Sequence, residues 1–186
     1  NNSTTLSGLP GEWGQGISGG GIDMSQSNAS FTNVTINNNR SRWGGGMMIY
    51  TNSNPVLTNV NIINNISDSP DDGGGGMYIT NANPIMKNVN ISNNTAGHEG
   101  GGMFLLGSNP SLLNVTISGN TANSRGGGIY IDWSDQFYNN IPSSPRLINS
   151  IIYDNDPQSI YIENGAPNIT TISYCDIDDD EEEFIE

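Results

Sequence analysis

The chain has 186 residues, of which only 33% are hydrophobic, and its 19 acidic side chains against 5 Lys and Arg give a formal net charge of −14. This charge removes the attraction to phosphate and to anionic lipid, and no apolar run reaches the roughly 18 residues of a membrane span, so we expect neither nucleic-acid binding nor membrane insertion. The single cysteine, Cys175, excludes an internal disulfide.

In chain order, residues 1–18 come first and are expected to form a partial N-terminal coil or cap. Residues 3–8 are similar to residues 114–119, as though the chain began inside a repeat. Residues 19–177 carry the repeat itself. Residues 178–186 include a run of acidic side chains, which repel one another, and are expected to form an acidic C-terminal tail or the start of a following module.

The repeat is marked by a glycine triplet followed by alternating apolar residues. Triplets begin at Gly19, Gly44, Gly74, Gly100 and Gly126, at spacings of 25, 30, 26 and 26 residues. A period in this range is typical of stacked supersecondary units, none of which can bury its apolar face alone. Because Gly, Asn and β-branched residues dominate and the apolar period is two, we expect short strands.

Aligned on the triplets, the apolar residues fall into columns that should point toward one axis. The first strand of each coil supplies Ile22, Met47, Met77, Met103 and Ile129, then Met24, Ile49, Ile79, Leu105 and Ile131. The second strand supplies Phe31, Leu57, Met86, Leu112 and Leu147. The third supplies Val34, Val60, Val89 and Val115, then Ile36, Ile62, Ile91, Ile117 and Ile152. Each coil therefore turns three apolar faces toward a shared core.

Two columns of asparagine accompany the strands, and we expect both to form buried ladders. One contains Asn33, Asn59, Asn88, Asn114 and Asn149, and the other Asn39, Asn65, Asn94, Asn120 and Asn155. Asn tolerates the left-handed conformation, and its amide can bond to the equivalent amide one coil away, about 4.8 Å distant. The glycine triplets should supply positive φ angles or close backbone approach at the remaining corner. The sequence thus predicts an all-β fold, a right-handed parallel β-helix (solenoid) of about six coils with Gly and Asn ladders.

Coils such as GGGMYITNANPIMKNVNISNNTA make the chain similar to the pectate-lyase-like superfamily, and within it to bacterial surface and secreted proteins built from right-handed parallel β-helix repeats. The resemblance covers residues 19–177 and implies the fold. For function it implies two classes, because some members are polysaccharide lyases or hydrolases, whereas many resemble adhesins, autotransporter passengers or sorted cell-surface proteins.

The outward positions do not offer the groups that polysaccharide chemistry needs. Lyases of this fold combine calcium-binding carboxylates with an Arg or Lys base, and hydrolases need paired carboxylates about 5 to 9 Å apart. Lys87 and Arg146 fall in different outward columns, and the one histidine, His98, falls beside Glu99 in what we expect to be a solvated turn. We therefore predict no catalytic residues and no cofactor, with a weak calcium site at Asp71 and Asp72 left open. Other turn charges, expected to be solvated, are Arg40, Arg42 and Arg125.

The outward column of the first strand is aromatic. Tyr78, Phe104 and Tyr130 should stack on successive coils and expose a continuous apolar patch, and such patches usually mark contacts. Alternatively, the loop of residues 132–145 covers the stripe. Uncovered, the stripe and loop would form a groove for sugar rings, with carboxylates accepting hydroxyl hydrogen bonds, or a docking face for another chain. The candidate contact residues are Tyr78, Phe104, Tyr130, Asp132, Trp133, Asp135, Phe137 and Tyr138.

Several asparagines begin N-x-S/T sequons, which follow mostly from an Asn- and Thr-rich repeat. Asn33, Asn39, Asn65 and Asn114 belong to the expected ladders, where a buried amide could not carry a glycan. The possible glycosylation sites are therefore Asn90, expected to point outward, and Asn93, expected in a turn.

These patterns favour a non-catalytic extracellular module, a structural or adhesive segment of a larger cell-surface or filament protein. Its expected partners are a polysaccharide or surface glycan, or other protein chains of a surface assembly. The alternative is a carbohydrate-active enzyme or a carbohydrate-binding domain that uses the aromatic face.

Overall fold

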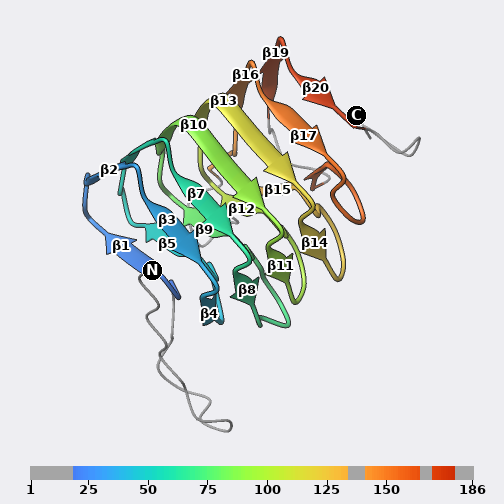
Figure 1. The fold of residues 1–186 in the computed structure, drawn as a ribbon, viewed down its shortest axis with the longest axis horizontal. Coiled ribbons are helices and arrows are strands. Elements are labelled where there is room, and N and C mark those ends of the chain that lie inside the picture. Colours follow the sequence, from blue (N-terminus) through green and yellow to red (C-terminus); the bar gives the residue numbers. More distant parts are fainter. Residues whose placement is uncertain (1–18, 134–140, 164–168, 179–186) are drawn as a thin grey trace, which may run out of the picture.

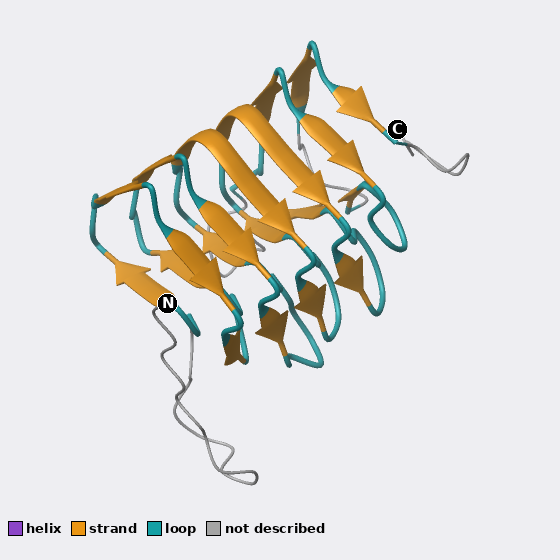
Figure 2. Cartoon of the chain, viewed as in Figure 1, coloured by secondary structure: helices purple, strands orange, loops and turns teal. Residues whose placement is uncertain are grey.

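The computed structural model describes residues 19–133, 141–163 and 169–178, and in these residues all regular structure is β-strand (Figure 1, Figure 2). Every strand pairing is parallel, and each strand pairs with its counterparts one coil before and after. β1 and β20 lie at opposite ends of the stack in Figure 1. The chain is thus a right-handed parallel β-helix of about six turns, as the sequence predicts. No helix in the described part of the chain could span a membrane.

The first strands of the coils form a six-stranded sheet. It contains, in spatial order, β1 (Ile22–Ser25), β5 (Met47–Tyr50), β9 (Met77–Thr80), β12 (Met103–Leu106), β15 (Ile129–Asp132) and β18 (Ile160–Ile162). The register aligns the predicted inward columns, since Met77 pairs with Met103 and Ile79 with Leu105.

The second and third strands form one ten-stranded sheet, because β10 (Ile85–Ser92) and β13 (Ser111–Ser118) run through both rows. The second row adds β2 (Ser30–Thr32), β6 (Val56–Thr58), β16 (Arg146–Ile148) and β19 (Thr171–Ser173). The third row adds β3 (Thr35–Asn37), β7 (Asn61–Ile63), β17 (Ile151–Tyr153) and β20 (Asp176–Ile177). A further four-stranded sheet of two-residue strands contains β4 (Arg40–Ser41), β8 (Ile66–Ser67), β11 (Thr95–Ala96) and β14 (Thr121–Ala122).

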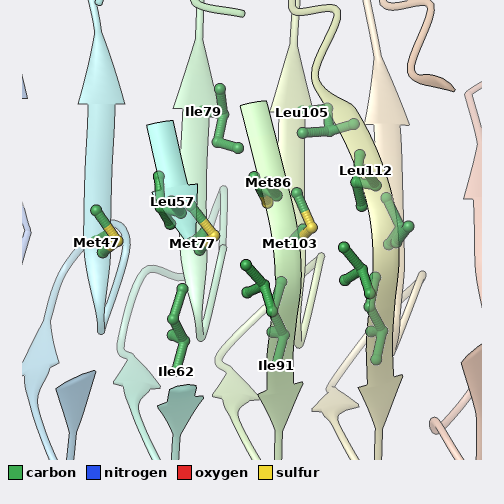
Figure 3. Close-up of a cluster of buried hydrophobic side chains, with 14 of the residues drawn as sticks. Met47, Leu57, Ile62, Met77, Ile79, Met86, Ile91, Met103, Leu105 and Leu112 are labelled. Carbon is green, nitrogen blue, oxygen red and sulfur yellow. The ribbon is translucent and has the colours of Figure 1, made fainter. Parts of the chain in front are cut away.

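The core lies inside the coils, where the side chains of all three rows meet (Figure 3). Met77, Ile79, Met86 and Ile91 come from three faces of one coil, and each is fully buried. The predicted inward columns are confirmed, although in the first described coil Ile22, Phe31 and Val34 are only partly buried. Burying one such side chain contributes about 1.5 to 3 kcal/mol, so each coil is stable only when its neighbours complete its burial.

Each glycine triplet makes a corner with little room for a side chain. The first glycine has positive φ, for example +67° at Gly100. A Cβ on the second glycine would meet backbone of the next coil, as at Gly75, where it would lie 2.5 Å from the carbonyl oxygen of Gly101. Both expected roles of the triplet, left-handed backbone and close approach, are therefore confirmed.

The second of the two predicted Asn columns forms a buried ladder. Asn94 donates from its amide nitrogen to the backbone oxygen of Ile62 and to Oδ1 of Asn120, both at 2.9 Å. Its own Oδ1 accepts from the backbone nitrogen and the side-chain amide of Asn65, at 2.9 and 3.0 Å. The same pattern links Asn39 to Asn65 and Asn120 to Asn155, so this column ties five coils together inside the turn. We refer to it as the inner ladder.

The first predicted Asn column forms a ladder too, but its expected burial is wrong. Asn59, Asn88 and Asn114 each donate to the Oδ1 of the preceding member, beginning at Asn33, at 3.1 Å, and the side chains are exposed. Their φ angles of about 54 to 57° show why Asn stands there, since the corner requires the left-handed conformation. Left-handed backbone at this bend turns the side chain outward, so we refer to this column as the outer ladder.

A third Asn column was not predicted. Oδ1 of Asn28, Asn54 and Asn83 accepts the backbone N–H of Asn54, Asn83 and Asn109, respectively, at 2.8 Å. Residues that follow this column include Pro55, Pro84 and Pro110, whose carbonyl oxygens accept the N–H that begins the second strand one coil further on. The corner between the first and second strands is thereby hydrogen-bonded without an N–H from proline.

Candidate functional site

The aromatic stripe forms a stacked column, as the register predicts. The ring centroids of Tyr78 and Phe104 lie 4.9 Å apart, those of Phe104 and Tyr130 5.0 Å, and those of Tyr130 and Tyr161 5.5 Å. The expectation of an exposed patch is wrong, because Tyr78, Phe104 and Tyr130 are only 6%, 2% and 3% exposed. These rings form a second hydrophobic cluster on the outer side of the first sheet.

Partly buried side chains surround the stacked column at its edges. Trp43, Met48, Leu106 and Tyr161 pack against the three buried rings. Of the other candidate contact residues, Asp132 ends β15 and its Oδ1 accepts the backbone N–H of Trp133 at 2.7 Å. Asp135, Phe137 and Tyr138 lie outside the described residues, as does the middle of the loop expected to cover the stripe.

At the C-terminal end of the column, polar groups from neighbouring coils converge. The Tyr130 hydroxyl donates to Oε2 of Glu163 at 2.5 Å. Arg125 donates to the same oxygen from Nη1 at 2.9 Å, and its guanidinium lies 5.0 Å from the centre of the Tyr161 ring. Glu163 directly follows β18, while Arg125 directly precedes a glycine triplet, so stacking alone brings together side chains that are 38 residues apart.

Glu99 adds a second carboxylate to this group. It occupies the position equivalent to Arg125 one coil earlier, and the two residues form a parallel β-bridge. Only 8% of Glu99 is exposed, and its Oε2 lies 3.6 Å from Nδ1 of His98. The turn at His98 and Glu99 is therefore not fully solvated, contrary to expectation, because the Glu99 side chain is turned into the protein while His98 remains partly exposed. We call Glu99, Arg125, Tyr130 and Glu163 the polar cluster.

Burial controls the electrostatics of the polar cluster. It raises the pKa of Glu99, an effect that His98 and Arg125 oppose and that Glu163 and Asp132 reinforce. Burial also raises the pKa of Tyr130, and the hydrogen bond to Glu163 adds to the rise, so Tyr130 stays a hydroxyl donor. The cluster thus contains one carboxyl group whose pKa is raised by burial and a second that accepts hydrogen bonds from a guanidinium and a phenol.

Most other turn charges form exposed ion pairs. Arg40 pairs with Asp68 at 2.6 Å, and Arg42 lies 3.7 Å from Asp71. Burial raises the pKa of the neighbouring Asp72 carboxyl, and Asp71 adds to the rise. Among the residues that the structure describes, no group of three or more His, Cys, Asp or Glu side chains is arranged to hold a metal ion. Lys87 and Arg146 are exposed on the second row, as expected.

The two possible glycosylation sites differ in exposure. Asn93 is exposed, whereas Asn90 is half-buried and its amide donates to the Ser92 hydroxyl at 3.1 Å. The exclusion of Asn33 and Asn114 on grounds of burial is wrong, because both belong to the exposed outer ladder. The exclusion of Asn39 and Asn65 agrees with their burial in the inner ladder.

Sequence reasoning missed the polar cluster because each member was considered alone. In the strand register Glu163 aligns with Asp132 one coil earlier, and Glu99 and Arg125 occupy equivalent turns. The available signal was the coil alignment itself, which puts Glu99 beside Arg125 and Tyr130 beside Tyr161. What the alignment could not supply was the reach of the Arg125 side chain toward Glu163.

Comparison with known proteins agrees with this architecture. The family model described as "Right handed beta helix region" matches residues 20–185. Neither a curated protein nor a solved structure gives a significant match. The stacked parallel coils and the match over nearly the whole chain lead to one conclusion: the chain belongs to the right-handed beta helix family.

Proposed function

We propose that this domain is a rigid, non-catalytic structural or adhesive module of a larger extracellular, cell-surface or filament protein. The observation that carries the proposal is the continuity of the stack, in which each coil is fixed to the next by backbone ladders and by the inner ladder. A solenoid of this kind holds surface groups at a regular spacing along a rod. Its acidic surface, with a net charge of −14, favours solubility and disfavours phosphate-rich partners.

We also propose that the chain is related to bacterial surface or secreted proteins of the pectate-lyase-like superfamily. This relationship is supported by the coil sequence and by membership of the wider right-handed beta helix family. The expected contacts are with a polysaccharide, a surface glycan or other protein chains. Because the aromatic rings are buried, we propose that these contacts are made by exposed polar groups beside the stripe.

A carbohydrate-active enzyme is the second candidate, and the polar cluster is the specific observation in its favour. Glycoside hydrolases use one carboxyl group that retains its proton and one that is ionised. Glu99, with its raised pKa, and Glu163, held by Arg125, offer two carboxyl groups in unequal environments.

Product release from polysaccharides distinguishes the two candidates. The purified protein is incubated with neutral and acidic polysaccharides, and reducing ends and unsaturated uronides are measured over time. A structural module releases neither, and the Glu163→Gln variant gives the same blank result. Turnover by the wild type that is lost in Glu163→Gln would replace the structural proposal with the enzymatic one.

A further inference from the structure

The polar cluster combines a buried floor with an accessible rim. Glu99 and Tyr130 are buried, whereas the Arg125 and Glu163 side chains are 44% and 28% exposed. The four residues come from three successive coils. Arg125 and Glu163 are therefore the more accessible members of the polar cluster, and Glu99 is the buried carboxyl group one coil before Arg125.

The backbone hydrogen bonding of the turn does not require a carboxylate at Glu99. The equivalent positions in neighbouring coils are Trp43, Gly73 and Arg125, whose backbone oxygens accept the same inter-coil hydrogen bond as that of Glu99. A carboxylate is thus not needed to form the turn. Because this position accepts such different side chains, the burial of a carboxyl group there must be explained by something other than the turn.

The Glu99 carboxylate also makes no hydrogen bond within the described residues. The Nδ1 atom of His98 lies 3.6 Å from Oε2 of Glu99, beyond hydrogen-bond distance, and this nitrogen is itself buried without a hydrogen bond. Glu163 uses only Oε2 for Arg125 and Tyr130, which leaves Oε1 without a hydrogen bond in the described part of the chain. Two carboxyl groups near Arg125 therefore have oxygens that accept no hydrogen bond from the described residues.

We propose that Glu99, Arg125 and Glu163 bind adjacent hydroxyl groups of a neutral sugar within a polysaccharide. This inference rests on the proposed glycan-contacting role and names the ligand class and the residues. A hydroxyl group donates to a carboxylate and accepts from a guanidinium, so two neighbouring hydroxyls match a Glu and Arg pair.

Charge selects a neutral sugar over other glycans. An acidic polysaccharide is repelled by the net charge of −14 and by the carboxylates of Glu99 and Glu163. The ammonium of an amino sugar would be attracted to the same carboxylates, but it could bind Glu163 only by competing with Arg125, which already pairs with Glu163 at 2.9 Å. Neutral hydroxyl groups avoid both costs.

Calorimetric titration of the full chain tests this inference. The probes are soluble oligosaccharides from neutral glucan, mannan and xylan, with chitosan oligomers and oligogalacturonate run in parallel. We expect the wild type to bind at least one neutral probe, and Glu99→Gln and Glu163→Gln each to weaken that binding about 10- to 100-fold, as loss of a charge-assisted hydrogen bond implies. The matched control is Asp68→Asn, which breaks the Arg40 ion pair in another turn and should bind as the wild type does.

A second measurement does not depend on the variants' folding. Backbone amide NMR shifts of the wild type should move around Glu99, Arg125 and Glu163 when the neutral probe is added. Binding of no neutral probe, preference for chitosan or oligogalacturonate, shifts confined to other coils, or unchanged affinity in folded Glu99→Gln would each overturn the inference. None of these results bears on the structural module, whereas polysaccharide turnover would contradict the module itself.

Discussion

The inner and outer ladders allow one substitution to be compared in two environments. Asn94 is fully buried in the inner ladder and Asn88 is exposed in the outer ladder, and each hydrogen-bonds to neighbouring coils through its side chain. Asn→Asp preserves side-chain shape, and Asp also tolerates the positive φ of Asn88. We therefore expect Asn94→Asp to be strongly destabilising and Asn88→Asp to be nearly neutral.

The magnitude follows from the bonds that Asn94 loses. Its amide donates to the Ile62 carbonyl and to Asn120 Oδ1 at 2.9 Å, and an Asp at this position would set an oxygen against each of these acceptors. Losing these two side-chain hydrogen bonds costs about 1 to 3 kcal/mol, because Asn120 Oδ1 keeps the backbone N–H of Asn94 as a donor. The new buried charge raises the cost to several kcal/mol. This is a large share of a typical stability of about 5 to 15 kcal/mol. At the exposed Asn88 water replaces the lost donor, and we expect a change of about 0.5 kcal/mol or less.

Equilibrium urea unfolding of both variants measures the difference. The loss in Asn94→Asp should also shrink as the pH falls, because burial would raise the pKa of the new carboxyl and protonation would remove the charge. Equal unfolding midpoints for the two variants would refute the assignment of one ladder to the interior and the other to the surface.

Three further substitutions test other parts of the structure. Gly75→Ala should lower the unfolding free energy by at least about 1 to 3 kcal/mol, since its Cβ would lie 2.5 Å from backbone. The control Gly119→Asn, where a Cβ meets only a side chain within 3.5 Å, should lower it less. Equal losses of unfolding free energy in urea would contradict the geometry of the corner. Phe104→Ala should lower the unfolding free energy by about 3 to 5 kcal/mol, because Phe104 is the middle ring of a buried stack. Tyr153→Ala, at an exposed position, should leave the melting temperature nearly unchanged. An unchanged melting temperature in Phe104→Ala would show that the rings do not form a core. The pKa of Glu99 in the folded protein lies above the usual 4.5, so the folded protein holds that proton more tightly than the unfolded chain does. Wild-type stability should therefore fall as the pH rises from 4.5 through the raised pKa, and Glu99→Gln should lack this part of the pH dependence. Identical profiles of stability against pH for the two proteins would exclude Glu99 as the source.

The fold could be predicted because its signals repeat. A single alternation such as Met77 and Ile79 would be ambiguous, but its return in register in five coils determines which face points inward. The glycine triplets set the coil boundaries, and the structure gives them the predicted positive φ and close backbone contacts. Strand pairing then follows from alignment alone, as Tyr130 opposite Tyr161 illustrates.

Burial outside the coils could not be predicted in the same way. Alternation states that Phe104 points away from the axis, but not whether other side chains cover it, so the exposed and covered alternatives were equal at the level of sequence. The predicted burial of the outer ladder was wrong for a related reason, because an Asn column has the same sequence pattern whether its side chains turn inward or outward. The positive φ of Asn88 decides this, and φ cannot be read from residue type.

The polar cluster shows why a functional site was harder to predict from the sequence than the fold was. Its residues are unremarkable singly, and Glu99 and Arg125 belong to turns in which charge is common. Their significance depends on side-chain reach and on burial, which the repeat does not encode. A sequence comparison between coils could have found the pair, since Glu99 and Arg125 replace Trp43 and Gly73 at one position.

Hydrogen exchange followed by NMR tests the central claim, that a buried ladder of amides joins the coils into one rigid module. The side-chain amide protons of Asn65, Asn94 and Asn120 and their backbone N–H groups should exchange only through global unfolding, because all are hydrogen-bonded and buried. The side-chain amides of Asn59 and Asn88 should exchange orders of magnitude faster at the surface. Fast exchange at Asn94 and Asn120, or protection that differs sharply from coil to coil, would contradict a single rigid stack.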